Sequence, residues 1–195
     1  MKKRPFLGKM LLGAAVLTMS LGTVSCKEDK NDPAEVAEEQ NEEKFDENEA
    51  KEDDSEFLVE AAAINMKEIE LGKLVENRSE NQALKSYAEM LVEEHTKANE
   101  ELKAIAKEMN VSLPMDLTED GKKAYENLKE ESGEDFANDY VDMMIKDHEE
   151  AIDEVEEGIE EANNEKVRAW AADILPKLRE HLAKAKDLKE KMESM

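Results

Sequence analysis

The chain has 195 residues, of which 40% are charged and 4% aromatic, and its formal net charge is −24. This charge argues against nucleic-acid binding, because no basic patch is present to displace phosphate counterions. It argues equally against direct adsorption to anionic lipid. Glu, Lys, Ala and Leu dominate while Gly and Pro are scarce, which predicts an all-α protein.

The first 25 residues have the pattern of a secretory signal peptide. A positive start at residues 2–4 precedes an apolar stretch at residues 10–21, which is shorter than a membrane-spanning helix needs. Small residues then lead to Cys26, the only cysteine, so an intramolecular disulfide is excluded. This arrangement resembles the lipobox of bacterial lipoproteins, in which the cysteine is lipidated and becomes the mature N-terminus. The alternative is an ordinary signal peptide with an incidental cysteine.

Residues 26–55 are expected to be the lipidated cysteine followed by a disordered acidic tether. Apart from Val36 and Phe45 the stretch has almost no large apolar side chain, so it buries too little surface to offset its ordering entropy. The start Cys-Lys-acid-acid is similar to the export signal of surface-exposed lipoproteins in the Bacteroidetes. We therefore expect an outer-membrane lipoprotein, facing the periplasm or the cell surface, whose membrane contact is the lipid on Cys26.

Residues 56–195 are expected to form one domain of four long helices and one short one. Apolar residues recur at helical spacing over residues 56–77, 80–109, 134–162 and 165–191. Ser79 with Gln82 predicts a capping box, and Pro176 predicts a kink in the last helix. A short helix over residues 118–130 lies in the one long connection. Two short turns and one crossover are typical of an antiparallel four-helix bundle, the ferritin-like arrangement among others.

One strongly polar residue interrupts the apolar stripe of each long helix. Three are histidines, His95, His148 and His181, and the fourth is Glu68 on the first helix. A carboxylate in a core costs several kcal/mol unless it is paired or coordinated. Three imidazoles and a carboxylate suit Fe, Zn, Mn or Cu. The alternative is a buried polar layer that only fixes helix register.

The position of each residue along the bundle axis indicates which members of this cluster can meet. Counted from the turn between the last two helices, His148 and His181 are about equally distant, so these two are expected to meet. Counted from Ser79, His95 is about five residues farther than Glu68, which is roughly 8 Å at 1.5 Å per residue. The heights therefore favour the His148–His181 pair, and they make Glu68 the least supported of the four direct ligands.

Neighbouring residues leave further alternatives open. The acids directly before the histidines either orient an imidazole of a neighbouring helix or face water; they are Glu94, Asp147 and Glu180. Nearby methionines either add soft ligation that favours copper or pack in the core; they are Met90, Met143 and Met144. The Glu-x-x-His motifs of the ferritin di-iron site are absent, because the residues three before the histidines are Val92, Ile145 and Leu178.

Motifs on all four long helices are shared with a known family. They are Glu68-Ile-Glu-Leu-Gly-Lys-Leu74, Met90 with His95, Leu113-Pro114, Phe136 with Tyr140 and Asp147-His148, and Leu175-Pro176 with His181-Leu182. Over residues 56–188 the chain resembles the bacterial family called domain of unknown function 4142, often labelled as outer-membrane proteins and grouped with ferritin-like folds. The resemblance implies a ferritin-like bundle in the cell envelope and carries no established reaction.

Taken together, these features predict an envelope lipoprotein whose bundle binds a transition metal for storage, buffering or stress protection. The predicted ligands are His95, His148, His181 and Glu68. The alternative is a non-enzymatic structural module, or one that binds an envelope protein partner, in which the polar layer serves only the fold. An envelope oxidoreductase has less support, because the sequence has no nucleotide loop, nucleophile–base signature or redox cysteine pair.

Overall fold

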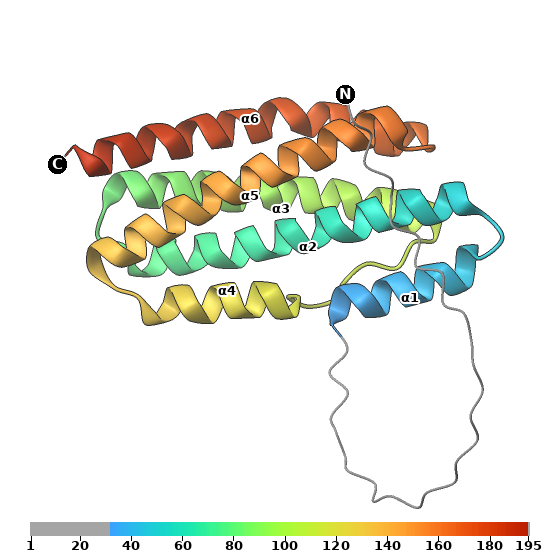
Figure 1. Cartoon of the computed structure of the whole chain (residues 1–195), viewed down its shortest axis with the longest axis horizontal. Coiled ribbons are helices and arrows are strands. Elements are labelled where there is room, and N and C mark those ends of the chain that lie inside the picture. The colour runs from blue at the N-terminus through green and yellow to red at the C-terminus, as the bar shows by residue number, and fades with distance from the viewer. Residues whose placement is uncertain (1–31, 195) are drawn as a thin grey trace, which may run out of the picture. The chain divides into compact units, whose positions relative to one another are not determined.

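The structure is a computed structural model that describes residues 32–194. These residues form six helices and no strand, which confirms the all-α class (Figure 1). The helices are α1 (Pro33–Phe45), α2 (Glu49–Arg78), α3 (Gln82–Met109), α4 (Glu119–Glu130), α5 (Gly133–Glu161) and α6 (Glu165–Glu193). The predicted signal peptide and Cys26 lie outside the described residues. None of the helices in the described part combines the length and apolar character needed to cross a membrane.

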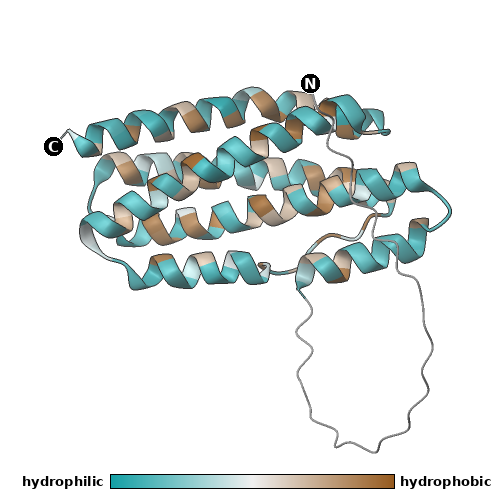
Figure 2. Cartoon of the chain, viewed as in Figure 1, coloured by the Kyte–Doolittle hydropathy of each residue, from teal (hydrophilic) through white to brown (hydrophobic). Residues whose placement is uncertain are grey.

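The four long helices pack around a shared core. A short link returns α3 along α2, another returns α6 along α5, and contacts of α3 with α6 and of α2 with α5 join the pairs. Figure 1 shows α1 and α4 along the same side of α2, where both pack. Apolar residues alternate with hydrophilic ones along each long helix, as Figure 2 shows, because one face of each is buried.

The expectation of a disordered tether is wrong for residues 33–55, which form α1 and the first turns of α2. The carboxylate of Asp32 caps α1 by accepting from the Ala34 backbone N–H at 2.8 Å. Phe45 is buried, and the Asn41 side chain both donates to and accepts from the backbone of Ser112, at 2.9 and 2.7 Å. The composition argument missed this segment because polar hydrogen bonds, as well as apolar area, dock it on the core.

Helix ends otherwise fall close to their predicted places. The predicted capping box is wrong, because Ser79 ends α2 and Asn81 caps α3 by accepting from the backbone N–H groups of Ala83 and Leu84. The short helix α4 lies where the sequence predicts it, and the Thr118 hydroxyl caps it by accepting from the Gly121 backbone N–H. Pro176 lies inside α6.

Candidate metal centre

The three histidines and Glu68 form a buried polar layer, one residue from each long helix. Glu68 and His148 are 0% exposed, and His95 and His181 are 2% exposed. Below we call this set the polar layer. On every long helix it separates two apolar clusters, one built around Leu58, Leu102 and Trp170, the other around Leu71, Leu91 and Tyr140. The two apolar clusters are therefore separated at one level at which each long helix contributes a titratable side chain.

The imidazoles converge on one another. His148 Nε2 lies 3.2 Å from His181 Nδ1, and the His95 ring centroid lies 5.6 Å from that of His148 and 5.2 Å from that of His181. One ligand nitrogen from each ring lies within 4.8 Å of the other two. Two nitrogens at about 2.0–2.1 Å from a tetrahedral zinc ion are roughly 3.3 Å apart. The His148–His181 spacing therefore suits two ligands of one ion.

The nitrogen on the far side of each ring meets a hydrogen-bond acceptor. His95 Nδ1 lies 2.7 Å from Asn65 Oδ1, and His148 Nδ1 lies 2.8 Å from the Met144 carbonyl oxygen. His181 Nε2 lies 3.1 Å from a Glu94 carboxylate oxygen. Because an acceptor requires a donor opposite it, each of these outer nitrogens holds the ring proton. The inner nitrogens, His95 Nε2, His148 Nε2 and His181 Nδ1, are then left with lone pairs that face one another.

Glu68 adds a negative charge to this set of lone pairs. Its Oε2 lies 2.6 Å from His95 Nε2 and its Oε1 lies 3.5 Å from His148 Nδ1. Neither contact has hydrogen-bond geometry, so both carboxylate oxygens and His95 Nε2 have no hydrogen-bond partner within residues 32–194. A buried carboxylate without a donor or a cation is costly. When all three imidazoles are neutral, the inner face of the polar layer thus gathers acceptors and lacks positive charge.

The pKa shifts in the polar layer follow from burial and mutual charge. Burial opposes ionisation of Glu68, but positive charge on His148 and His95 outweighs it and lowers the pKa of Glu68 to about 2. Burial, together with charge on His95 and His148, lowers the pKa of His181 to about 4 despite the nearby Glu94. Glu68 is therefore ionised at neutral pH whenever the layer carries a cation, while His181 itself stays neutral.

The structure confirms that His148 and His181 meet, and it corrects the predicted height of Glu68. The link between the two helices extends to Asn81 rather than ending at Ser79. Glu68 therefore lies ten residues before the end of α2, and His95 lies thirteen residues after the start of α3. The difference of three residues is roughly 4.5 Å, which a glutamate side chain spans. Gly72 also allows α2 and α3 to approach, since a Cβ there would lie 2.6 Å from Val92 Cγ2.

The acids before the three histidines have three different roles. Glu94 contacts His181 on the neighbouring helix, as one of the two alternatives predicted. Asp147 is buried and pairs with Lys67 at 2.8 Å, and burial raises the pKa of its carboxyl group. Glu180 lies on the surface with Lys184. Only the first of these acids therefore touches an imidazole.

Sequence analysis missed two side chains that hold the layer in place. Asn65 is 6% exposed and orients His95, although the predicted stripe placed its neighbour Ile64 inward. The Tyr87 hydroxyl donates to the His181 backbone carbonyl at 3.3 Å. Met144 supports His148 through its carbonyl group, and its buried side chain belongs to an apolar cluster, as does the half-buried Met143 beside it. The Met143 and Met144 side chains therefore match the predicted alternative of core packing.

Comparison with known proteins places this arrangement in a family. The model of the family described as domain of unknown function (DUF4142) matches residues 39–188, which include every residue of the polar layer. The chain belongs to the DUF4142 family. The sequence resemblance is thereby confirmed, and the match begins within α1, in agreement with the folded segment before residue 56.

One solved structure shares the fold of this DUF4142 chain. It is the crystal structure of a DUF305 fragment from Deinococcus radiodurans, with a TM-score of 0.63 at 12% identity, covering 71% of this chain and 95% of that one. At that identity the likeness concerns the helical fold alone. No curated protein matches the sequence.

Proposed function

We propose that this protein binds a transition metal, Fe, Zn, Mn or Cu, through His95, His148 and His181, with Glu68 as a further ligand or as the charge that balances the ion. The observation that carries the proposal is the orientation of the rings. All three outer nitrogens meet acceptors, so the three inner nitrogens are left with lone pairs, and one ligand nitrogen of each ring lies within 4.8 Å of the others. Imidazole-rich sites of this kind favour these metals over Mg²⁺ or Ca²⁺.

The alternative, a structural polar layer, explains less of this geometry. Without a metal, the three inner nitrogens and the two Glu68 oxygens are all acceptors, and extra protons would have to bridge them. The lowered pKa of His181 opposes one such proton, because burial and the charges of His95 and His148 disfavour its cationic form. A metal ion supplies positive charge to the carboxylate and to all three lone pairs at once.

The biological role that fits such a site is metal storage, buffering or stress protection in the cell envelope. We place the site in an antiparallel, ferritin-like four-helix bundle held at the outer membrane by a lipid on Cys26. The sequence supports this placement through the signal-peptide pattern and the lipobox-like cysteine. The acidic surface of the bundle repels anionic lipid and nucleic acid, and we propose an envelope protein as the partner beyond the lipid anchor.

Metal analysis of the full chain tests the proposal. Protein prepared from cells grown with ample Fe, Zn, Mn and Cu should contain about one ion per chain by mass spectrometry of the elements. His148→Ala should lose the ion, and Lys146→Ala, a surface change two residues away, should keep it. Wild-type protein that holds no metal and gains no thermal stability from any of the four would contradict the proposal.

A further inference from the structure

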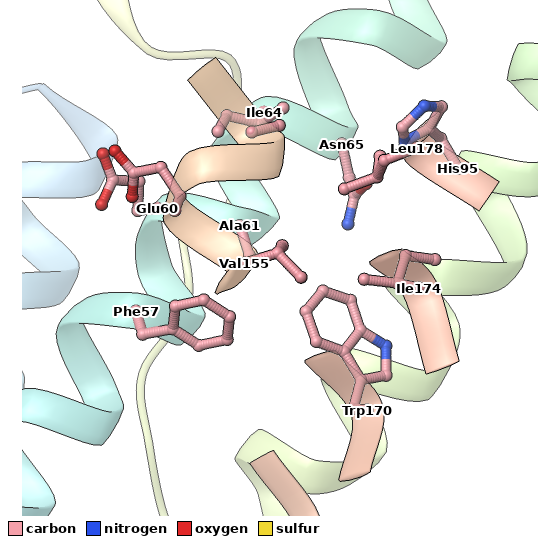
Figure 3. A pocket seen from close by; sticks show the side chains of 12 residues that line it. Phe57, Glu60, Ala61, Ile64, Asn65, His95, Val155, Trp170, Ile174 and Leu178 are labelled. Carbon is pink, nitrogen blue, oxygen red and sulfur yellow. Dashed lines mark hydrogen bonds between the residues drawn. The ribbon is translucent and has the colours of Figure 1, made fainter. Parts of the chain in front are cut away.

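A narrow cavity runs between the surface and the polar layer. Its volume is about 30 Å³, which is room for roughly two water molecules. Figure 3 shows Glu60 at one edge and His95 with Asn65 at another, with Ala61 and Val155 between them. Glu154 also lines the cavity, and the remaining walls are apolar. The cavity thus connects an acidic mouth with one of the proposed ligands.

The mouth carries a concentration of negative charge from three helices. Glu60 on α2 and Glu154 on α5 line the same mouth, and burial, then the neighbouring Glu154 carboxylate, raise the pKa of Glu60 to about 8. The pair therefore holds one proton at neutral pH. Glu38 on α1 and Glu56 on α2 add their charges to the same pair. Many surface acids of this chain pair with lysine, for example Glu149 with Lys186. Within the described residues none of the four mouth acids has such a partner.

The inner end of the cavity independently points to a ligand. His95 is 2% exposed and its Nε2 has no hydrogen-bond partner in the described part of the chain. The Asn65 Nδ2 group is equally without a partner, although its Oδ1 is held by His95, and Figure 3 shows it pointing into the cavity. Unsatisfied buried polar atoms are rare in native proteins, and a buried N–H donor marks a place where a water belongs. The cavity is therefore hydrated at its inner end, beside His95, whose Nε2 faces Glu68 and the other histidines.

We infer that Glu60 and Glu154 form a capture site for a divalent cation, and that the cavity is its route to the three histidines. This inference rests on the proposed metal centre. Binding of the cation to the two carboxylates releases the shared proton to solvent, and the ion then moves about eight residues along α2, roughly 12 Å, to the level of Glu68. Capture at the mouth is transient because only two protein ligands hold the ion there.

The apolar walls are compatible with this route. A cleft lined by one sign of charge and bounded by low-dielectric walls focuses the field and raises the local concentration of counter-ions. The carboxylates at the mouth and Glu68, which lies beyond the inner end, both attract a cation. A neutral or anionic ligand would find no donor at the mouth.

Loading with Co²⁺ tests the route, because its visible absorption reports each ion that reaches a tetrahedral site. In the full chain, Glu60→Gln with Glu154→Gln should slow loading roughly tenfold or more, and the final absorbance should not change. The matched control, Glu89→Gln with Glu190→Gln, removes two exposed charges elsewhere and should leave the rate nearly unchanged. Ala61→Leu, which narrows the cavity without altering its mouth, should also slow loading.

The outcomes separate the route from the metal centre. Wild-type protein that loads Co²⁺ at the same rate as the Glu60→Gln, Glu154→Gln variant would overturn the capture site. Unchanged loading by Ala61→Leu would overturn the cavity as the path. Wild-type protein without any Co²⁺ spectrum would overturn the proposed metal centre itself, and the route with it.

Discussion

His148 and His181 face each other at 3.2 Å through nitrogens whose opposite ring positions are both occupied by acceptors. A direct hydrogen bond between them would require a proton on one of these two nitrogens. The Met144 carbonyl holds the His148 proton on Nδ1, and Glu94 holds the His181 proton on Nε2. The pair is therefore better suited to hold a cation jointly than to bond to itself. This relationship favours the proposed metal centre over a layer that only fixes helix register.

Glu94→Gln is expected to weaken metal binding by roughly 10–100-fold, because the carboxylate that holds the His181 proton outward is replaced by a neutral amide. The measurement is a competition titration with a chromophoric chelator. Glu180→Gln is the matched control, because Glu180 directly precedes His181 in the sequence but its carboxylate pairs with Lys184 on the surface. Equal affinities in the two variants would show that Glu94 does not support the site.

Glu68→Gln is expected to have opposite effects with and without metal. In the metal-free protein with neutral imidazoles, Glu68 is a buried charge without a hydrogen-bond donor, so the variant should raise the unfolding free energy by roughly 1–3 kcal/mol. It should also reduce the stabilisation gained on adding metal, which for a single site is about 2.7 kcal/mol at a hundredfold excess over Kd. Urea unfolding with and without metal measures both.

A fall in metal-free stability on Glu68→Gln would support the alternative interpretation. It would mean that the carboxylate is already paired with a protonated imidazole, as a purely structural layer requires. His95 is the partner at 2.6 Å that would carry this proton.

Asn41→Ala is expected to lower the unfolding free energy by roughly 1–3 kcal/mol, because the part-buried backbone N–H and carbonyl of Ser112 lose the buried Asn41 side chain as their partner. The exposed neighbour Glu39→Ala should change it little. Thermal unfolding compares the two variants. No difference between them would show that α1 is not docked as described.

Glu60→Gln is expected to stabilise the protein increasingly as the pH rises. Burial, then the hydrogen bond and charge of Glu154, raise the pKa of Glu60 to about 8. Between about pH 4.5 and that value the folded chain keeps a proton that the unfolded chain has lost, so the wild-type unfolding free energy falls with rising pH. The glutamine stays neutral throughout and avoids this loss.

The advantage of Glu60→Gln over wild type should therefore be larger at about pH 9 than at about pH 5 when Tm values are compared. Glu89→Gln, an exposed residue outside the mouth, serves as the reference and should show no such trend. A pH-independent difference for Glu60→Gln would contradict the shared proton.

The long helices and their inward histidines follow from the sequence because periodicity depends only on local geometry. His148 and His181 meet where residue counting from their turn places them. Glu68 was misplaced because the count began at Ser79, whereas the link extends to Asn81. A shift of two residues at a turn moves every later residue by roughly 3 Å.

Buried polar residues with distant partners were harder to predict. Asn65 is held by His95, 30 positions away, and Asn41 by Ser112, 71 positions away. Neither interaction leaves a periodic signal, because an asparagine in a stripe looks like any exposed polar residue until its partner is known. For the same reason α1 was not predicted, since its docking depends on a loop that follows α3.

X-ray absorption spectroscopy of the metal-loaded full chain tests the central claim most directly. The account predicts that the bound ion has three imidazole nitrogens at about 2.0–2.1 Å, with the multiple-scattering pattern of histidine, and that His181→Ala removes one of them. An ion coordinated by oxygen alone, or a spectrum identical in wild type and His181→Ala, would contradict a metal centre built on the three inward histidines.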